Sequence, residues 1–230
     1  MRRGKTYKAK VALVKSESQY PLREAVALVK STARAKFDET VEMHLRLEVD
    51  PKQPDQNVRG TVLLPHGIGK TKRVVVVAKG EKVKEAEQAG ADLAGGEELI
   101  DKIAKGWMEF DVLVSTPDMM KDLSKLGKTL GPRGLMPNPK SGTVTFDLAR
   151  TVKEIKAGKI EYKVDPAGII HAPVGRASFA ADQLEANARA LWGAVLHARP
   201  ASVKGQFFRS VALATTMGPG VRLDPNQRLE

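Results

Sequence analysis

Apolar and polar residues alternate strictly along residues 41–49. The apolar positions are Val41, Met43, Leu45, Leu47 and Val49, and the residues between them are Glu42, His44, Arg46 and Glu48. Successive side chains of a strand point to opposite faces, so this pattern predicts a half-buried strand, most simply in an antiparallel sheet. Residues 60–64, which follow a turn-rich segment, are predicted to form the strand that returns beside it.

Two segments near the chain ends show helical spacing instead. After Pro21, which suits a first helical turn, Leu22, Val26 and Val29 lie on one helix face. A longer helix is predicted over residues 180–198, and Arg199-Pro200 ends it. Its apolar face consists of Leu184, Ala188, Leu191, Val195 and Ala198.

The middle of the chain alternates between predicted strands and helices. Strands are predicted at residues 73–78 and 110–115, with a short apolar piece at 91–94. Thr116 or Ser115 can cap a helix that begins at Pro117. Further helices are predicted at 81–89, 97–105 and 147–157, and Gly158 ends the last of them. This order is typical of a Rossmann-like α/β layer.

Antiparallel signals return after residue 159. Residues 159–164 and 169–174 are predicted to form a hairpin around the turn at 165–168, and 207–215 and 221–223 to form two further strands.

The fold class is therefore α/β with two domains. Domain I is discontinuous, α+β, and spans 1–67 and 159–230, and domain II is an inserted Rossmann-like domain at 68–158. The two connections, near residues 67 and 159, would act as a hinge if few contacts cross them.

Composition adds a preference for polyanionic partners. Lys and Arg number 38 against 27 Asp and Glu, a net charge of +11, which favours nucleic acid through phosphate neutralisation. Cysteine is absent, and there is neither a secretory signal nor a segment of about 20 apolar residues that could span a bilayer. We therefore expect a cytoplasmic protein without disulfides and without a membrane partner.

The chain contains no catalytic or cofactor-binding motif with the residue spacing that such motifs require. Gly69-Lys70-Thr71 resembles the end of a Walker loop, but Leu64 stands where the first glycine is needed. The four histidines are scattered, and no Gly-x-Ser-x-Gly elbow occurs. The sequence therefore nominates no catalytic residue, no metal ligand and no cofactor.

Residues 126–142 contain three prolines and four glycines, a composition that predicts a long ordered loop and neither helix nor strand. Lys128, Arg133 and Lys140 make this loop basic. The loop could contact RNA phosphates, or it could be a structural crossover whose charges are simply solvated. Both interpretations stay open on the residues alone.

Two short segments at predicted strand edges have a composition that suits RNA. Residues 36–40 and 215–219 each combine small polar groups with one apolar side chain, Phe37 and Met217 respectively. Such side chains can pack on nucleotides, hydroxyls can bond 2′-hydroxyl groups, and glycine permits close backbone approach. The competing interpretation is that Phe37 and Met217 are ordinary core residues.

Six motifs together resemble the bacterial type of the large-subunit ribosomal protein L-one family along essentially the whole chain. They are Phe37 to Glu42, Asp55 to Gly60, Leu63 to Gly67, Gly131 to Lys140, His171 to Gly175, and Thr215 to Pro219. The resemblance implies a discontinuous RNA-binding domain with an inserted three-layer α/β domain. It also implies binding to stalk rRNA, movement and release of exit-site tRNA, and repression of the protein's own operon through its mRNA.

The resemblance also implies which residues contact rRNA and mRNA. The expected contacts are Lys36, Phe37, Thr40, Glu42, Ser210, Thr216, Met217 and Gly218. Lys128, Arg133 and Lys140 are candidates for additional RNA or tRNA contacts. Glu42 is unusual beside RNA: it could accept from 2′-hydroxyl or base amino groups, or it could hold a neighbouring cation.

We expect a monomer off the ribosome that is not an enzyme. The competing hypotheses are an enzyme that uses the α/β domain as a nucleotide site, and a protein-interaction module with incidental charge. The basic excess does not locate the site, because basic residues outnumber acidic ones 13 to 8 in residues 1–67, 17 to 13 in 68–159 and 8 to 6 in 160–230.

Overall fold

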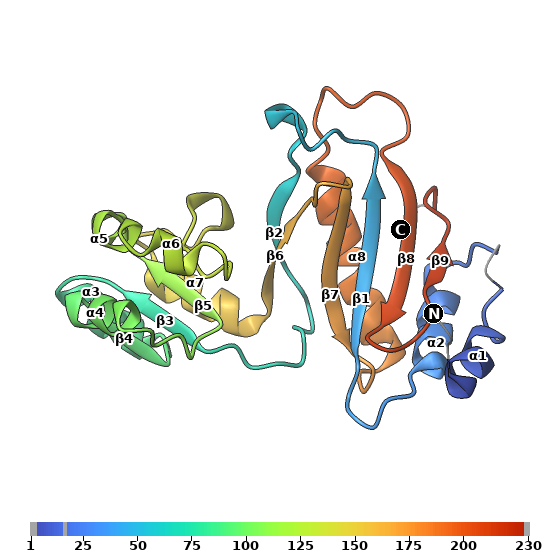
Figure 1. The fold of residues 1–230 in the computed structure, drawn as a ribbon, viewed down its shortest axis with the longest axis horizontal. Coiled ribbons are helices and arrows are strands. Elements are labelled where there is room, and N and C mark those ends of the chain that lie inside the picture. Colours follow the sequence, from blue (N-terminus) through green and yellow to red (C-terminus); the bar gives the residue numbers. More distant parts are fainter. Residues whose placement is uncertain (1–3, 16–17, 228–230) are drawn as a thin grey trace. The chain divides into compact units, whose positions relative to one another are not determined.

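The computed structural model describes residues 4–15 and 18–227. The chain divides into two compact units (Figure 1). One contains the residues up to Gly69 together with those from Ile160 onward, and the other is Lys70–Lys159. We call these units domain I and domain II.

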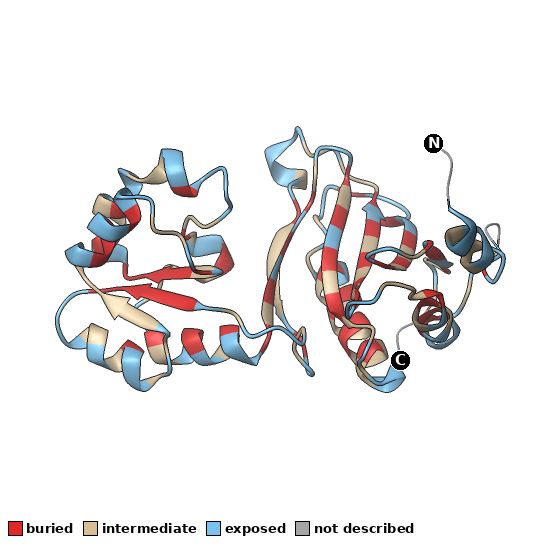
Figure 2. Ribbon diagram, turned by 60° about the horizontal axis from the view of Figure 1, so that its bottom comes forward, coloured by how far each residue is buried: buried red, intermediate tan, exposed pale blue. Residues whose placement is uncertain are grey.

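Domain I is built on a four-stranded antiparallel sheet in the order β7-β1-β8-β9. The strands are β1 (Thr40–Leu47), β7 (Ile169–Arg176), β8 (Phe208–Thr215) and β9 (Val221–Leu223). Residues of β1 alternate between buried and less buried positions (Figure 2). The strand predicted from alternation is therefore confirmed, as are the last two strands of the chain.

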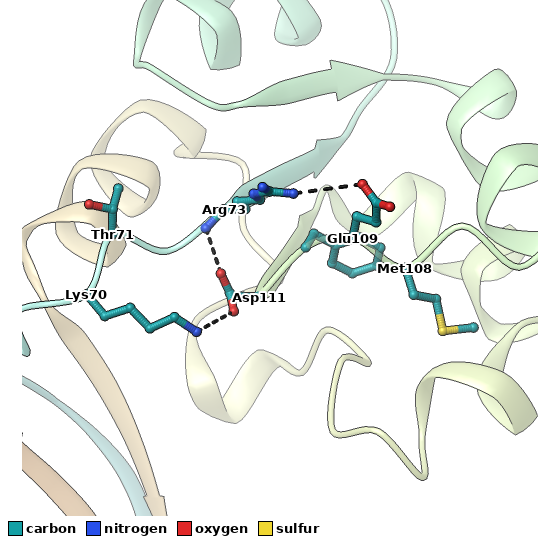
Figure 3. Close-up of a pocket in the computed structure, with 7 residues that line it drawn as sticks. Lys70, Thr71, Arg73, Met108, Glu109 and Asp111 are labelled. Atoms are coloured by element: carbon teal, nitrogen blue, oxygen red, sulfur yellow. Dashed lines mark hydrogen bonds and ion pairs between the residues drawn. The ribbon is translucent and has the colours of Figure 1, made fainter. Parts of the chain in front are cut away.

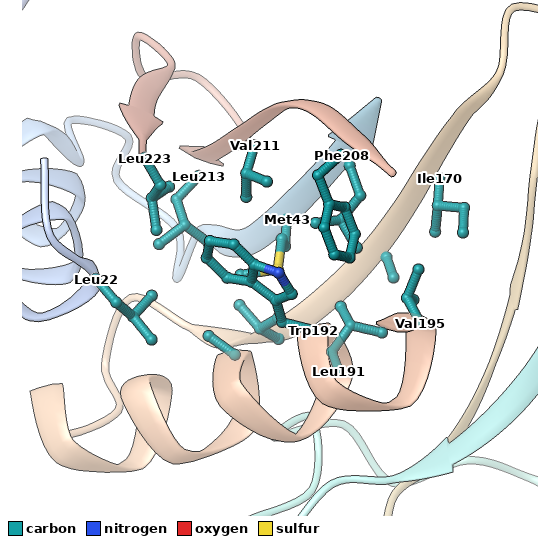
Figure 4. Packing of buried hydrophobic residues seen from close by; sticks show 14 of the residues in the cluster. Leu22, Met43, Ile170, Leu191, Trp192, Val195, Phe208, Val211, Leu213 and Leu223 are labelled. Atoms are coloured by element: carbon teal, nitrogen blue, oxygen red, sulfur yellow. The ribbon is translucent and has the colours of Figure 1, made fainter. Parts of the chain in front are cut away.

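Helices α2 (Leu22–Thr32) and α8 (Ala181–His197) cover the apolar face of this sheet. Trp192 of α8 lies at the centre of the core, 2% exposed, with its ring centroid 5.8 Å from that of Phe208 (Figure 4). Met43 of β1 is fully buried beside it. Truncating a buried aromatic side chain of this kind costs about 3–5 kcal/mol, so the packing of this layer contributes strongly to the stability of domain I.

The prediction that residues 60–64 return beside β1 is wrong. Strand β2 (Arg59–Leu63) pairs with β6 (Lys159–Lys163) in a separate two-stranded sheet. Both edges of β1 are already occupied by β7 and β8. The β2-β6 ribbon is also closely fitted, since a Cβ added at Gly60 would lie 2.5 Å from the hydroxyl of Tyr162.

The hairpin predicted around residues 165–168 is correct only at its turn. The Asp165 carboxylate accepts hydrogen bonds from the backbone N–H groups of Ala167 and Ile169, and Gly168 has a φ of 79°. Beyond the turn, β6 and β7 separate into different sheets and share one isolated bridge, between Val164 and Ile170. Strand β7 takes β1 as its partner instead.

Domain II contains a three-stranded parallel sheet in the order β4-β3-β5. Its strands are β3 (Val74–Val77), β4 (Leu93–Gly95) and β5 (Val112–Ser115). Its helices are α3 (Glu81–Gln88), α4 (Glu97–Ala104), α5 (Met120–Ser124), α6 (Gly127–Leu130) and α7 (Leu148–Ala157). Val75 and Val77 pack into one apolar cluster and Val74 and Val76 into another, so helices cover both faces and the three-layer α/β prediction is confirmed.

Some local predictions need correction. Residues 126–142 are not wholly irregular, because α6 and a 3-10 turn, η3 (Pro139–Ser141), lie within them; each is too short to produce a periodic pattern. The helix expected at Pro117 starts as a 3-10 turn, η2 (Pro117–Met119), and the Thr116 side chain makes no capping hydrogen bond. Helix α1 (Lys5–Val11) and the 3-10 turn η1 (Pro54–Gln56) were not predicted.

Candidate nucleic-acid interface

The start of β1 and the end of β8 lie side by side, although 176 residues separate them in sequence. The Thr216 N–H donates to the Thr40 carbonyl at 3.1 Å, and the Thr40 N–H donates to the Thr216 hydroxyl at 3.1 Å. We call residues 34–40 together with 215–218 the strand-end site. Of the eight residues expected to contact RNA, this site contains Lys36, Phe37, Thr40, Thr216, Met217 and Gly218.

A buried carboxylate joins the two halves of the strand-end site. Glu39 is 1% exposed. One of its oxygens accepts from the backbone N–H groups of Arg34 at 2.7 Å and Ala35 at 2.6 Å, and the other accepts from that of Met217 at 3.0 Å. One side chain therefore holds backbone groups of both segments.

Glu39 remains charged at neutral pH in spite of its burial. Burial by itself raises the pKa of this carboxyl, but the hydrogen bonds from Ala35, Met217 and Arg34 outweigh it and lower the pKa from 4.5 to about 2. Sequence analysis missed this residue. The sequence pattern could have identified it. Extending the alternation of β1 towards the N-terminus places position 39 on the buried face, where a carboxylate needs hydrogen-bond donors.

Phe37 and Met217 are exposed, at 57% and 45%, so the alternative that they are core residues is wrong. The segment that carries Phe37 is held from its other side by Asp38, whose carboxylate accepts from the N–H and the hydroxyl of Ser178 at 3.0 and 2.8 Å. Large apolar side chains held in solvent by an ordered backbone are suited to contact a partner.

The remaining members of the strand-end site divide into surface groups and a tight turn. Lys36 and Thr216 are exposed, and Thr40 is partly exposed. Gly218 has no room for a side chain, because an added Cβ would lie 2.3 Å from the Thr215 hydroxyl oxygen and 3.4 Å from that of Thr32. Glycine is therefore required there by packing, whatever else approaches the turn.

Glu42 and Ser210 lie outside the strand-end site, on the face of the sheet opposite α2 and α8. Glu42 is paired with Pro173 on one side and Ala214 on the other. Among the residues that the structure describes, none donates a hydrogen bond to its carboxylate. Ser210 is exposed opposite Arg46, several residues further along the same open face.

Two histidines occupy this open face next to Glu42. The Nδ1 atoms of His44 and His171 are 2.8 Å apart, so one ring must donate and the other accept. Burial lowers the pKa of His44 below 6.5 and His171 lowers it further, whereas Glu42 raises it. The lowered pKa keeps the His44 ring neutral at neutral pH.

The three basic residues of the loop at 126–142 are all exposed in domain II. Lys128 lies on α6, Arg133 follows it, and Lys140 lies in η3. Asn138 orders this part of the loop, since its side chain accepts from the Lys140 N–H at 2.8 Å while its own N–H donates to Thr143. None of the three basic residues forms an ion pair with a described residue.

Domain II has a cavity of about 360 Å³ beside Lys70, but its charges are already paired (Figure 3). Lys70 lies 3.2 Å from the Asp111 carboxylate, and Arg73 lies 3.9 Å from that of Glu109. Arg73 and Asp111 directly precede β3 and β5, so the cavity lies at the amino ends of the parallel strands. Nucleotides bind at the opposite, carboxyl ends of such sheets, so this cavity does not support the nucleotide-enzyme hypothesis.

Within residues 4–15 and 18–227, no three His, Asp or Glu side chains are arranged to hold a metal ion. The helices of the same described part are all too short or too polar to cross a membrane.

A model of the ribosomal protein L1p/L10e family matches residues 29–219. The chain belongs to this family. It is accordingly a ribosomal protein of the large subunit that binds rRNA, and a structural component of the ribosome, not an enzyme. The match includes both halves of the strand-end site and the whole of domain II, whereas α1 and β9 lie outside it.

Proposed function

We propose that the strand-end site is the rRNA-binding surface and that its target is the folded RNA of the large-subunit stalk. The observation that carries this proposal is the Glu39 carboxylate, which joins two distant segments into one rigid surface with exposed Phe37 and Met217. RNA loops are recognised through stacking, hydroxyl contacts and shape, and a preorganised surface lowers the entropic cost of such binding.

Each residue expected to contact RNA has a chemical role in this proposal, both in the strand-end site and, for Glu42 and Ser210, on the open face of the same sheet. Lys36 neutralises a phosphate, and Phe37 and Met217 pack against sugars or bases. Thr40, Thr216 and Ser210 bond 2′-hydroxyl groups or phosphates, and the turn at Gly218 lets the backbone approach closely. Glu42, which has no hydrogen-bond donor among the described residues, accepts from a 2′-hydroxyl or a base amino group.

We further propose that the same surface binds the mRNA of the protein's own operon and so represses its translation. A surface that reads shape and exposed sugar edges will accept any RNA that presents the same fold. Domain II would take part in the movement and release of exit-site tRNA, with Lys128, Arg133 and Lys140 as its contacts. Off the ribosome the protein would be a monomer.

Binding of a stalk rRNA fragment and of the leader mRNA to the full chain tests this proposal, with chemical footprints of both RNAs. We expect salt-sensitive binding, mutual competition, and loss of both complexes when the strand-end site is altered. A chain in which residues 70–159 are replaced by a short linker should retain most of its rRNA affinity. If RNA affinity instead follows domain II, the assignment of the site is wrong.

A further inference from the structure

Helix α1 is the most basic element of the chain and lies outside the segment that matches the family. The first sixteen residues contain six Lys or Arg and no Asp or Glu. Helix α1 itself buries no side chain, and Lys5 and Lys8 are exposed. An element that contributes so little to the core and concentrates one sign of charge is suited to an external partner.

The helix is attached to domain I along one face. Lys10 donates to the Ser31 carbonyl at 2.6 Å, the Arg34 guanidinium carbon lies 5.3 Å from the centroid of the Tyr7 ring, and Val14, just beyond the helix, is 7% exposed. Figure 1 shows α1 beside α2. At 3.6 residues per turn, Lys5 and Lys8 lie on the opposite face, directed to solvent.

Arg34 connects α1 to the strand-end site. Besides contacting Tyr7, its Nε donates to the Met217 carbonyl at 2.9 Å. Its own backbone N–H is one of the donors held by Glu39. Helix α1 is therefore linked to the strand-end site through the face that carries Tyr7, by specific contacts and not by charge alone, while Lys5 and Lys8 point to solvent from its other face.

We propose that α1 is a second RNA contact, in which Lys5 and Lys8 neutralise phosphates of the strand that continues from the RNA held at the strand-end site. This inference rests on the proposed function of that site. Lysine acts here as a point charge without a fixed fork, so α1 adds affinity and salt dependence but does not select a sequence.

The test compares two double variants of the full chain that remove the same charge. Lys5→Ala/Lys8→Ala alters α1, and Lys52→Ala/Lys204→Ala alters two exposed lysines near the far end of the same sheet, in the segments that follow β1 and precede β8.

Affinity for the stalk rRNA fragment is measured from about 0.05 to 0.5 M KCl. We expect the first variant to lose roughly tenfold in affinity near 0.15 M and to reduce the slope of log K against log salt by about 2. The second should behave as the unaltered chain.

A second variant tests the positioning of the helix. Tyr7→Leu keeps both lysines but removes the aromatic face beside Arg34, and should lower rRNA affinity severalfold with unchanged circular dichroism. In the unaltered chain, rRNA should also protect Lys5 and Lys8, but not Lys52, from acetylation.

The outcomes separate this inference from the proposed function. If the unaltered chain binds the rRNA fragment and Thr216→Ala weakens it, while Lys5→Ala/Lys8→Ala matches its control, then α1 is not an RNA contact and the strand-end site stands. If Thr216→Ala and Met217→Asp leave rRNA binding unchanged, the proposed function of the strand-end site is wrong, and the inference about α1, which rests on it, falls with it. Equal losses in both lysine variants would show a general charge effect and overturn the inference.

Discussion

The four-stranded sheet of domain I and the three-stranded sheet of domain II differ in how many of their faces are covered. In domain II every residue of β3 is buried, because helices pack on both sides of the parallel sheet. In domain I helices cover one face, and β1 alternates between core residues and partly exposed polar residues. A sheet covered on both sides offers only its loops to a partner, whereas a half-covered sheet also offers a face and its strand ends. The candidate rRNA surface lies in the half-covered sheet.

The largest effect should come from Glu39→Ala. Removal of the carboxylate leaves the N–H groups of Arg34, Ala35 and Met217 without their acceptor, and each such loss costs about 1–3 kcal/mol when the group stays buried. We expect a loss of about 3 kcal/mol or more in the free energy of unfolding and severe loss of rRNA binding, measured by urea denaturation and filter binding. The control is Glu161→Ala on β6, whose carboxylate is partly exposed. If Glu39→Ala costs no more than this control, the carboxylate does not organise the site.

Acid should affect the same group. The pKa of Glu39 is lowered from 4.5 to about 2, so its stabilising contribution is complete above pH 4.5 and is lost as pH falls from 4.5 toward 2. By linkage the contribution is at most about 3 kcal/mol. Urea denaturation at several pH values should show a weaker acid dependence for Glu39→Gln than for the unaltered chain between pH 5 and 2. Parallel curves would contradict the assigned pKa.

Met217→Asp should have the next largest effect, which we expect on rRNA binding and not on folding. A carboxylate in place of an exposed apolar side chain repels RNA phosphates, and we expect about a hundredfold loss of rRNA affinity, near 2.7 kcal/mol. Leu196→Asp on α8 is a matched control, since Leu196 is also 45% exposed in domain I. Calorimetric titration with the rRNA fragment measures both, and circular dichroism checks the fold. Equal affinities of the two variants would remove Met217 from the interface.

Thr216→Ala should have a smaller effect. It removes the acceptor of the Thr40 N–H and a hydroxyl available to RNA, and a single hydrogen bond contributes about 0.5–1.5 kcal/mol. We expect about a fivefold loss of affinity at constant salt. Thr216→Ser, which keeps the hydroxyl, should restore most of it; a serine variant as weak as the alanine variant would point to the methyl group instead.

The smallest effect on the rRNA fragment should come from the basic loop of domain II. Lys128→Ala, Arg133→Ala and Lys140→Ala combined should leave rRNA affinity within about twofold, because these residues lie in the other domain. On assembled ribosomes the same variant should slow release of exit-site tRNA. A large loss of rRNA affinity would make the two domains equal partners in binding.

The open and the covered sheet could be distinguished from sequence because their patterns are local. Alternation at 41–49 predicted a half-buried strand, and the strand at 73–78 was predicted within an α/β layer; both strands are confirmed. The wrong predictions concern which strands pair with one another. Strand β2 was assigned to β1 and pairs with β6, and the residues predicted as a hairpin separate after its turn. A strand's pattern shows which face is buried but not which strand lies beside it, since several edges compete for the same backbone donors.

The amino-acid sequence by itself determined the α/β fold class, most helices and strands, the basic charge and, through its motifs, the family. The tertiary structure decided that residues near 40 and 216 form one surface, that Glu39 joins them while Phe37 and Met217 stay exposed, and that Ser210 lies apart from them along the sheet. Periodicity and motifs are properties of neighbouring residues, whereas this surface depends on long-range strand pairing and on one buried charge whose donors come from both ends of the chain.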